Sequence, residues 1–560
     1  MKQLFISVET LSNKCLKDVG VYRYTELPAF STPLIAAAFD DMPVRIIDMC
    51  HGEAIPSDIR NALLDPECRK IAFDAQFNRV CLSKVLGMPV GTYLPPEQWI
   101  CLKSKALYKG MPDDMKPLCR MLKIVESYGD EMTDVLRRRC FVLRKKNRTA
   151  ELNAEWPLYQ ECLRAKLNSI RMLSNRLDLC PMPDAERQLY IDCQQINDRG
   201  IKVDTRMVDN AIHIYDDWRN GALYQLYLIT GVRDIKDVER FKLWLTNQGV
   251  AVKDLSQSSI EKYLTKYNFY PVNAALTLWQ HLNRSAIAKY RKIQECVSAD
   301  GRLRGAYTYC GANAGRFGNG PVQLDNLPVS ELSNLVELRE LICANDVENL
   351  DKCGFSIPSS LSELVTTVFI PDKEHTLRVY TYNALEKSVE NWLFGENGID
   401  EFCRKLDIGL DLLMKRDGKV TVGKITVRRN GEPLEVVLPS GRVLAYRDFY
   451  WWEPGLITFT GYDDHHRWVQ KEQNTAKIAY DIVSAVSRDI LSDAIERFEA
   501  HGSKVVMFYP GTIITECSAE EDDFDPLTRT PQWTEAFVPR SHIYSCCSFL
   551  EKSTDVKRRC

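Results

Sequence analysis

The pattern of hydrophobic positions divides the chain into two mixed regions with a helical region between them. Near the N-terminus, Leu4, Ile6 and Val8 recur at every second position of LFISVET, which predicts a strand. VRIIDM at 44–49 and RKIAF at 69–73 predict further strands. PSDIRNALLD, which begins with a proline and a serine, predicts a helix. Strands that alternate with helices favour an α/β domain over residues 1–185, with a mixed sheet covered by helices.

The period becomes helical from Asp184 to about Lys292. ERQLYIDCQQINDRG predicts an amphipathic helix that ends at Gly200, and Asp204 can cap the long helix predicted after it. The glycine-rich segment YCGANAGRFGNGPVQLDNLP at 309–328 comes next and is too polar for a core strand.

The last ~200 residues are mixed again. LPSGRVLAYR predicts a turn followed by a strand, and SKVVMFYPGTIITE predicts a hairpin with Pro510 and Gly511 at its turn. Between them, residues 475–500 predict a long helix that ends before Gly502. The apolar positions on one face of that helix are Ile478, Ile482, Val486, Ile490 and Ala494.

Length and charge limit the possible functions. A chain of 560 residues is too long for one core, so we expect two to four domains. We find no apolar stretch long enough for a membrane span and no signal peptide, so we expect no membrane partner and a cytoplasmic location. With a net charge of −3, binding to nucleic acid would require local basic patches. Leu136–Arg148 is one candidate, and a solvated face or flexible loop is the alternative.

The residues that could bind metal are scattered. The 19 cysteines include no CxxC pair, and only Cys546 and Cys547 are adjacent, so we interpret them as reduced thiols in core positions. The run 463–466 (Asp-Asp-His-His) cannot direct four consecutive side chains at one ion, and the acidic run 520–523 is typical of a solvated loop. We therefore predict no metal site from local motifs.

Several longer segments resemble the bacteriophage branch of the family A (DNA polymerase I-like) DNA polymerases, and they occur in the family's order. They are SVETLSNKCLKDVGVYRY, IAFDAQFNRVCLSKVLG, LPPEQWICLKSKALYKG, QQINDRGIKVD, CGANAGRFGNGPVQLDNLP, NALEKSVENWLFGE, LPSGRVLAYR and NTAKIAYDIVSAVSRDIL.

The resemblance implies an α/β multidomain fold. A ribonuclease H-like, 3'-5' exonuclease-type domain would occupy residues 1–185, and a helical thumb with a duplex-contact segment would occupy 186–330. An antiparallel-sheet palm would follow at 331–560, with remnant fingers at about 397–437.

In this family both activities use paired Mg²⁺ ions held by carboxylates. The resemblance places Ser7 and Glu9 at the Asp-x-Glu motif of the exonuclease strand, so the aspartate is missing. At the second exonuclease motif, Asp74 and Asn78 have the acid and the amide exchanged.

The third exonuclease motif of the family is a tyrosine followed four residues later by an aspartate. The frame that starts from Glu155 and Trp156 puts Cys162 and Lys166 at those positions. A lysine facing the site would repel Mg²⁺. Three of the four carboxylate positions therefore lack an acid, and the resemblance implies an inactive exonuclease-like domain.

The polymerase motifs show the same loss. Thr381 stands where the family has the metal-binding aspartate of the first palm strand, although Glu386 of that motif is kept. Pro510, Gly511 and Thr512 replace the family's His-Asp-Glu hairpin. The resemblance therefore implies that both metal-binding aspartates of the palm are absent.

The fingers are shortened as well. About forty residues separate Gly395 from Leu438, where the family has roughly a hundred before its LPSGR segment. They predict one helix, IDEFCRKLDIGLDLLMKR, and a hairpin with Asn430 and Gly431 at its turn, with no helix for binding a nucleotide triphosphate.

The resemblance implies that the family's surface for binding duplex DNA is kept in this chain. The family counterpart of Arg316 holds the primer-template, and Gln323 and Asn326 match residues near the same duplex. Gly315 permits close approach of backbone to backbone, and Ala314 replaces a threonine. A guanidinium suits phosphate, and amides suit minor-groove acceptors. The alternative is that this loop only packs thumb against palm.

These features lead us to expect a pseudoenzyme: a non-catalytic polymerase homologue of phage origin that binds DNA or assists replication, without a cofactor. Its expected partners are primer-template or other duplex DNA, or another polymerase or replication protein. Two alternatives stay open. One is a protein-interaction scaffold built on the polymerase fold, and the other is an active polymerase with relocated or partner-supplied metal ligands.

Overall fold

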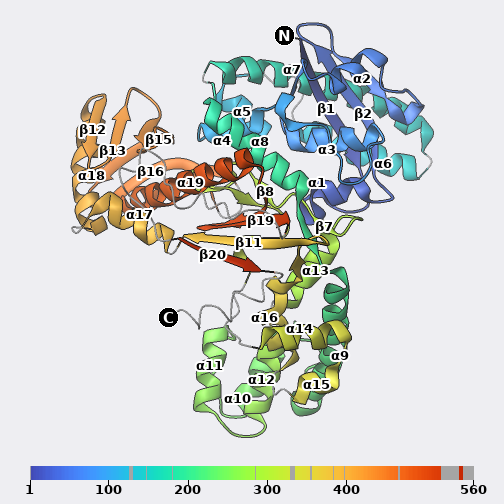
Figure 1. The fold of residues 1–560 in the computed structure, drawn as a ribbon, viewed down its shortest axis with the longest axis vertical. Coiled ribbons are helices and arrows are strands. Elements are labelled where there is room, and N and C mark those ends of the chain that lie inside the picture. The colour runs from blue at the N-terminus through green and yellow to red at the C-terminus, as the bar shows by residue number, and fades with distance from the viewer. Residues whose placement is uncertain are drawn as a thin grey trace.

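Five sheets and a helical body make up the part of the chain that the structure describes, and the N-terminal α/β domain and the helical body lie at opposite ends (Figure 1). The computed structural model describes residues 2–124, 130–146, 148–179, 181–283, 286–327, 334–352, 356–382, 384–395, 398–463, 467–518 and 541–546. The mixed α/β fold predicted from the sequence is confirmed.

The N-terminal domain is built on a five-stranded sheet of order β3-β2-β1-β4-β5. The strands are β1 (Gln3–Leu11), β2 (Ser31–Phe39), β3 (Arg45–Asp48), β4 (Arg69–Ala72) and β5 (Trp99–Cys101). β1, β2 and β3 pair antiparallel, whereas β4 and β5 continue the sheet in parallel. β1 is buried on both faces. Its alternate side chains therefore point into two different hydrophobic cores, and neither face of the strand is exposed to solvent.

Helices cover both faces of this sheet. They are α1 (Leu16–Glu26), α2 (Ser57–Leu64), α3 (Ala75–Val85), α4 (Leu102–Tyr108), α5 (Met115–Met121), α6 (Asp130–Lys145) and α7 (Thr149–Asp178). The basic run predicted as a DNA patch or solvated face falls mostly in α6, where Leu136 and Cys140 are buried and Arg139 pairs with Glu155 at 2.6 Å.

Helix α8 (Asp184–Arg199) connects the N-terminal domain to the rest of the chain and ends at Gly200 as predicted. Gly200 has a φ of 61°, and a Cβ there would clash with the backbone of Leu303, so only glycine fits. Asp198 in α8 receives two hydrogen bonds of 2.7 Å from the buried guanidinium of Arg79, which ties α8 to the N-terminal domain.

The helical body contains α9 (Thr205–Thr230), α10 (Val238–Asn247), α11 (Gln257–Lys266), α12 (Val272–Leu282), α13 (Ala286–Cys296), α14 (Leu335–Ala344), α15 (Val347–Lys352) and α16 (Ile357–Leu364). Asp204 caps α9 as predicted, because its carboxylate accepts a hydrogen bond from the Met207 amide. α14 and α16 pack against α9, so the domain boundary expected at residue 330 passes through this packed group. A small sheet of β6 (Ile201–Val203), β7 (Arg302–Leu303) and β10 (Phe369–Ile370) lies at its base.

A four-stranded antiparallel sheet lies at the centre of the molecule, in the order β18-β19-β11-β20. Its strands are β11 (His375–Tyr382), β18 (Lys504–Tyr509), β19 (Thr512–Ser518) and β20 (Ser541–Cys546). The predicted hairpin is β18–β19, and Gly511 takes a φ of 78° at its turn. Helix α19 (Ala476–His501) precedes it, and all five predicted apolar positions of α19 are fully buried.

A separate lobe contains a six-stranded antiparallel meander and two helices (Figure 1). Its elements are α17 (Leu385–Phe394), α18 (Gly398–Lys415), β12 (Gly418–Val422), β13 (Ile425–Arg429), β14 (Leu434–Val437), β15 (Val443–Glu453), β16 (Leu456–Tyr462) and β17 (Trp468–Gln473). The predicted helix is α18, and the predicted turn, with Gly431 at a φ of 76°, connects β13 to β14. The assignment of this lobe to remnant fingers stays a prediction.

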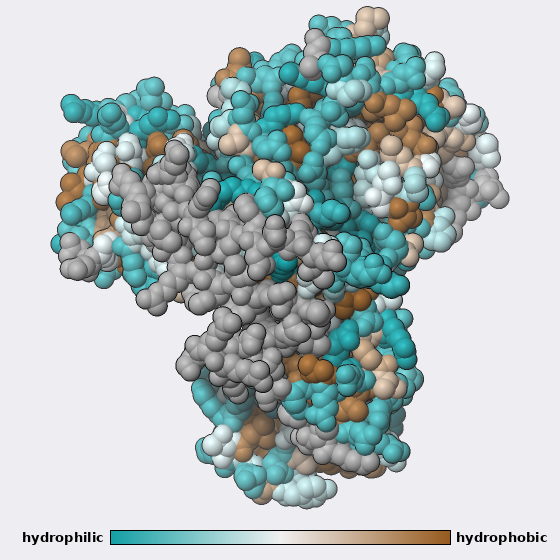
Figure 2. Space-filling model, in the orientation of Figure 1, coloured by the Kyte–Doolittle hydropathy of each residue, from teal (hydrophilic) through white to brown (hydrophobic). Residues whose placement is uncertain are grey.

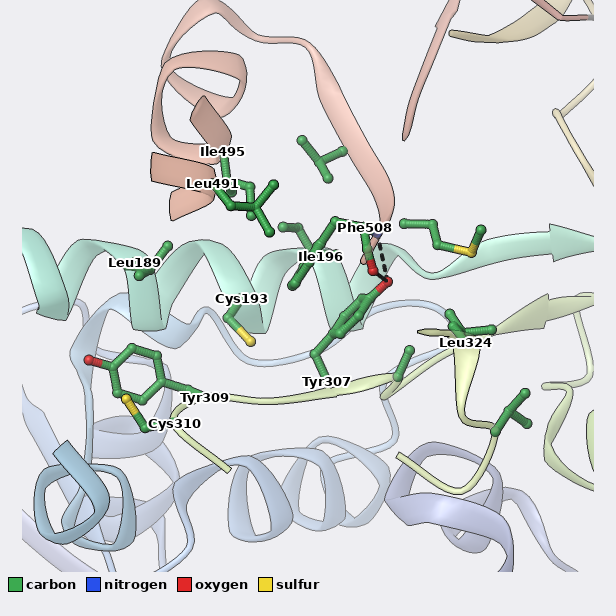
Figure 3. Packing of buried hydrophobic residues seen from close by; sticks show 14 of the residues in the cluster. Leu189, Cys193, Ile196, Tyr307, Tyr309, Cys310, Leu324, Leu491, Ile495 and Phe508 are labelled. Carbon is green, nitrogen blue, oxygen red and sulfur yellow. Dashed lines mark hydrogen bonds between the residues drawn. The ribbon is translucent and has the colours of Figure 1, made fainter. Parts of the chain in front are cut away.

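The main core lies where α8, α19, β18 and the short strand β8 (Tyr307–Thr308), which pairs with β9 (Gly318–Asn319), come together. Tyr307 stacks on Phe508, and its hydroxyl donates to the Phe508 carbonyl at 2.8 Å (Figure 3). Every cysteine whose side chain the structure describes is free and most are buried, as predicted for reduced core thiols. The visible surface is largely hydrophilic, with scattered hydrophobic residues (Figure 2). Among the described helices, none has the length and apolar character needed to cross a bilayer.

Candidate functional site

A cavity of about 930 Å³ lies between the glycine-rich loop, α17, α19 and the β18–β19 turn. Of the residues singled out in the sequence, it brings together Arg316, Gln323, Glu386, Pro510 and Gly511. These residues come from three segments that are far apart along the chain. The cavity is therefore the place where most of the predicted polymerase-type positions meet.

The glycine-rich loop is held in place by Arg442 of the LPSGR segment. The buried Arg442 guanidinium donates to Asp489 of α19 at 2.7 Å and to the carbonyl of Ala314 at 3.0 Å. Gly315 follows with a φ of 72°, and a Cβ there would clash with the same guanidinium. This close approach explains the glycine, and Gly315 is not among the residues that line the cavity.

Arg316 points into the cavity and remains 42% exposed. Its guanidinium lies 4.0 Å from the carboxylate of Glu386, which is 52% exposed. An ion pair this open is weak and can exchange partners readily. Gln323 also lines the cavity, but Asn326 does not, and the Asn326 side-chain amide donates to Gln323 Oε1 at 3.1 Å.

Buried polar groups of α19 form one wall of the cavity, and the sequence motifs did not single them out. Arg488 donates two hydrogen bonds, of 2.7 and 2.8 Å, to Glu186 of α8. Burial opposes the charge of Arg488, but Glu186 outweighs it, so the pKa of Arg488 is raised well above its usual value. Arg488 Nε and the hydroxyl of Ser487 are both buried, without a hydrogen-bond partner among the described residues.

Thr381 and Thr512 face each other in the central sheet. They are directly paired between β11 and β19, and their hydroxyl oxygens are 3.2 Å apart. Beside them, the Tyr382 amide donates to the Gly511 carbonyl at 2.8 Å. The structure thus places Thr381 beside the turn that stands where the family has His-Asp-Glu. The groups in contact there are two neutral hydroxyls and the polypeptide backbone.

The N-terminal domain brings Glu9 and Lys166 together. Lys166 Nζ lies 3.2 Å from one carboxylate oxygen of Glu9, and the hydroxyl of Tyr159 donates to the other oxygen at 3.1 Å. The side chain of Glu9 is 5% exposed and that of Lys166 is 23% exposed. Tyr159, which the sequence motifs did not single out, completes this buried group.

The other predicted exonuclease positions have structural contacts. Asn78 accepts a hydrogen bond from the Val8 amide at 2.9 Å, and buried Ser7 directly precedes Val8 on β1. Asp74 caps α3 and lies 3.5 Å from Lys103 Nζ. Cys162 is fully buried in a hydrophobic cluster, and burial raises the pKa of its thiol.

Potential metal-binding groups are sparse in the part of the chain that the structure describes, which holds no cluster of three or more His, Cys, Asp or Glu side chains placed to bind an ion. Within the run 463–466, only Asp463 is described, and it pairs with Arg467 at 2.7 Å. The acidic run 520–523 and Cys547 lie outside the described residues.

A second cavity, of about 420 Å³, adjoins the first and shares Gly311, Ala312 and Arg316 with it. The six-stranded sheet and the N-terminal domain form its opposite sides. Arg447 of β15 donates to the carbonyls of Lys109 and Gly110 at 3.0 Å each, and the Asp113 amide donates to the hydroxyl of Tyr462 at 2.9 Å. These contacts close one side of the cavity.

The sequence is similar to that of a known phage protein. It is 30% identical over 406 residues to a protein named DNA polymerase from Bacillus phage SP02. The match covers 71% of this chain and 62% of the phage protein, so the chain spans less than two thirds of that relative. The chain is thus a relative of a phage DNA polymerase. The resemblance predicted from the sequence is confirmed at this level.

A solved structure supports the fold of this polymerase relative. The POL domain of Pol1 from M. smegmatis, in complex with DNA primer-template and dNTP, matches 98% of this chain and 95% of its own chain with a TM-score of 0.55. The sequence identity is 11%, so this likeness shows the fold alone. No family model matches the sequence.

Proposed function

We propose that this chain is a non-catalytic DNA polymerase homologue that binds duplex DNA at the cavity beside Arg316. The direct pairing of Thr381 with Thr512, whose hydroxyls are 3.2 Å apart, carries the non-catalytic part of the proposal. Mg²⁺ prefers oxygen ligands with negative charge, and a two-metal site needs several carboxylates. Two neutral hydroxyls that face each other do not fit paired Mg²⁺ ions.

The N-terminal domain supports the same proposal. Its sheet order, with three antiparallel strands extended by two parallel ones, supports an assignment as a degenerate, ribonuclease H-like domain of the exonuclease type. Lys166 already neutralises Glu9, and a second cation beside that ammonium group would be repelled. The side chains present therefore do not fit a magnesium site here either.

The cavity beside Arg316 has the groups that a nucleic-acid backbone requires. An exposed guanidinium can exchange its weak contact with Glu386 for a phosphate oxygen. Ser487 and Arg488 line the same cavity, and the buried Ser487 hydroxyl and Arg488 Nε have no hydrogen-bond partner among the described residues. The names of the phage relative and of the similar solved complex, which contains primer-template, add to this support.

The test uses a fluorescently labelled primer-template and measures anisotropy across a salt series. Binding should fall steeply with salt, because phosphate contacts release counterions. Arg316→Ala should weaken binding about tenfold, since a charge-assisted contact contributes roughly 1.5 kcal/mol. Arg404→Ala is the matched control, because Arg404 in α18 is exposed, pairs only with Glu401 in the described contacts, and does not line the cavity.

Equal weakening by both variants, or binding that is independent of salt, would contradict the DNA-binding part. The non-catalytic part has its own assay, in which the purified chain is given primer-template, nucleotides and either Mg²⁺ or Mn²⁺. We expect no primer extension and no release of 3' nucleotides. Synthesis by the purified chain would show that relocated ligands hold the metals and would reject the proposal.

A further inference from the structure

The outer face of the six-stranded sheet carries an exposed pair of aromatic side chains. Asp448 has a φ of 49°, and the pairing of β15 with β16 shifts between Arg447 and Tyr450, as at a β-bulge. Beyond this irregularity, Tyr450 is 49% exposed and Trp452 is 58% exposed, with their ring centroids 4.5 Å apart. We call these two residues the aromatic platform.

The platform is separate from the core of the lobe. The alternate residues of β15 point to the other face, where Phe449 is buried and the indole of Trp451 donates to Asp407 of α18 at 3.0 Å. The Trp452 indole instead donates to the hydroxyl of Thr458 on β16 at 3.3 Å. This contact holds the ring in place on the solvent side, so the platform is ordered without being buried.

The charged residues around the platform are acidic. Glu472 of β17 pairs with Thr458, which in turn pairs with Tyr450, so these three residues form one row across the sheet. Glu453 follows Trp452 directly, and Asp448 precedes Tyr450 by two positions; all three acidic side chains are exposed.

The basic residues described in β15–β17 and in the adjoining loop have other contacts. Arg447 donates to backbone carbonyls of the N-terminal domain, Lys471 donates to the Tyr462 carbonyl at 2.8 Å, and Arg467 pairs with Asp463. Aromatic rings attract cations at their faces, and exposed carboxylates add to that attraction. A phosphate backbone would be repelled by the same carboxylates.

We propose that the aromatic platform binds an arginine- or lysine-rich segment of a partner protein. The rings of Tyr450 and Trp452 would contact the cationic side chains, and Glu453 and Glu472 would supply the opposite charge. The residues of the aromatic platform do not line the cavity beside Arg316. This proposal therefore depends neither on DNA binding nor on catalysis.

The test measures binding of the full chain to a synthetic peptide of alternating arginine and glycine by calorimetry at low salt. Trp452→Ala and Tyr450→Ala should each weaken binding roughly fivefold, the loss expected for one exposed cation–π contact. Trp452→Phe keeps a ring and should lose less. Tyr270→Ala is the control, because Tyr270 is 77% exposed on the helical body and has no place in the platform.

The charge is tested separately with the double variant Glu453→Gln/Glu472→Gln. Binding of the arginine peptide should weaken and depend less on salt, and a matched glutamate–glycine peptide should not bind. Equal peptide affinity in the wild type, Trp452→Ala and Tyr450→Ala would overturn the proposal. So would Trp452-dependent binding of a single-stranded DNA oligonucleotide in preference to the peptide, which would assign the platform to nucleic acid.

Discussion

The two sheets that carry the expected metal-site positions have filled those positions differently. In the N-terminal sheet, the buried carboxylate of Glu9 is retained and the ammonium group of Lys166 neutralises it. In the central sheet, Thr381 and Thr512 face each other with no charge. A buried charge is tolerated only when it is paired, whereas a pair of hydroxyls needs only each other. A single substitution should therefore cost more stability in the first arrangement than in the second.

The largest effect is expected from Lys166→Met. Glu9 would lose its cation while 5% exposed, and breaking a buried pair in this way costs about 3 kcal/mol. Urea unfolding followed by circular dichroism measures the change. The double variant Lys166→Met/Glu9→Gln should recover much of the loss, because it buries no charge. A single variant as stable as the wild type would show that Glu9 needs no partner.

An effect of intermediate size is expected between α8 and α19, where several carboxyl groups lie close together. Burial raises the pKa of Asp192 to about 6 and that of Glu496 to about 7. The charged groups that act on Glu496 are Asp192, Asp493, Glu186 and Arg488.

The folded-state pKa values of both carboxyls are raised, so their protonation in the folded protein contributes stability. This contribution is fully present below about pH 4, the pKa of such carboxyls in the unfolded chain. It is lost as the pH rises through about 7. Glu496→Gln should therefore raise the melting temperature at pH 8 and change it little at pH 5. Thermal unfolding of both proteins at the two pH values tests this, and an equal shift at both would contradict it.

The smallest effect is expected at the central sheet. Thr381→Val/Thr512→Val removes both hydroxyls and keeps their shape, and such paired replacements are nearly neutral, within about 1 kcal/mol. Each single variant should be less stable than the double, because it leaves one hydroxyl without its partner. A double-mutant cycle by urea unfolding measures the coupling, and a double variant as damaging as Lys166→Met would remove the contrast between the two sheets.

Local patterns predicted much of this fold. The buried stripe of α19, the cap at Asp204 and the turns at Gly431 and Gly511 depend on residues close in sequence, and all are confirmed. β2 was not predicted, since its run PLIAAAF is buried on both faces and has no period to distinguish strand from helix.

The site depended more on distant contacts. The resemblance led to Arg316, Glu386 and Thr381, but not to the partners that fix their surroundings. Arg488 meets Glu186 across 302 residues, and no local pattern indicates such a pair. Asn326 was expected beside the duplex; in the structure its side-chain amide donates to the side-chain oxygen of Gln323, and Asn326 is not among the residues that line the cavity.

The contact between Arg447 and the carbonyl of Gly110 joins residues 337 positions apart. Chains leave the ribosome at about 5–20 residues per second and domains fold as they emerge. The N-terminal domain can thus complete its own core roughly tens of seconds before its partner strand has been made. Until then, the carbonyls of Lys109 and Gly110 are solvated by water, and the smaller cavity forms only when β15 replaces that water.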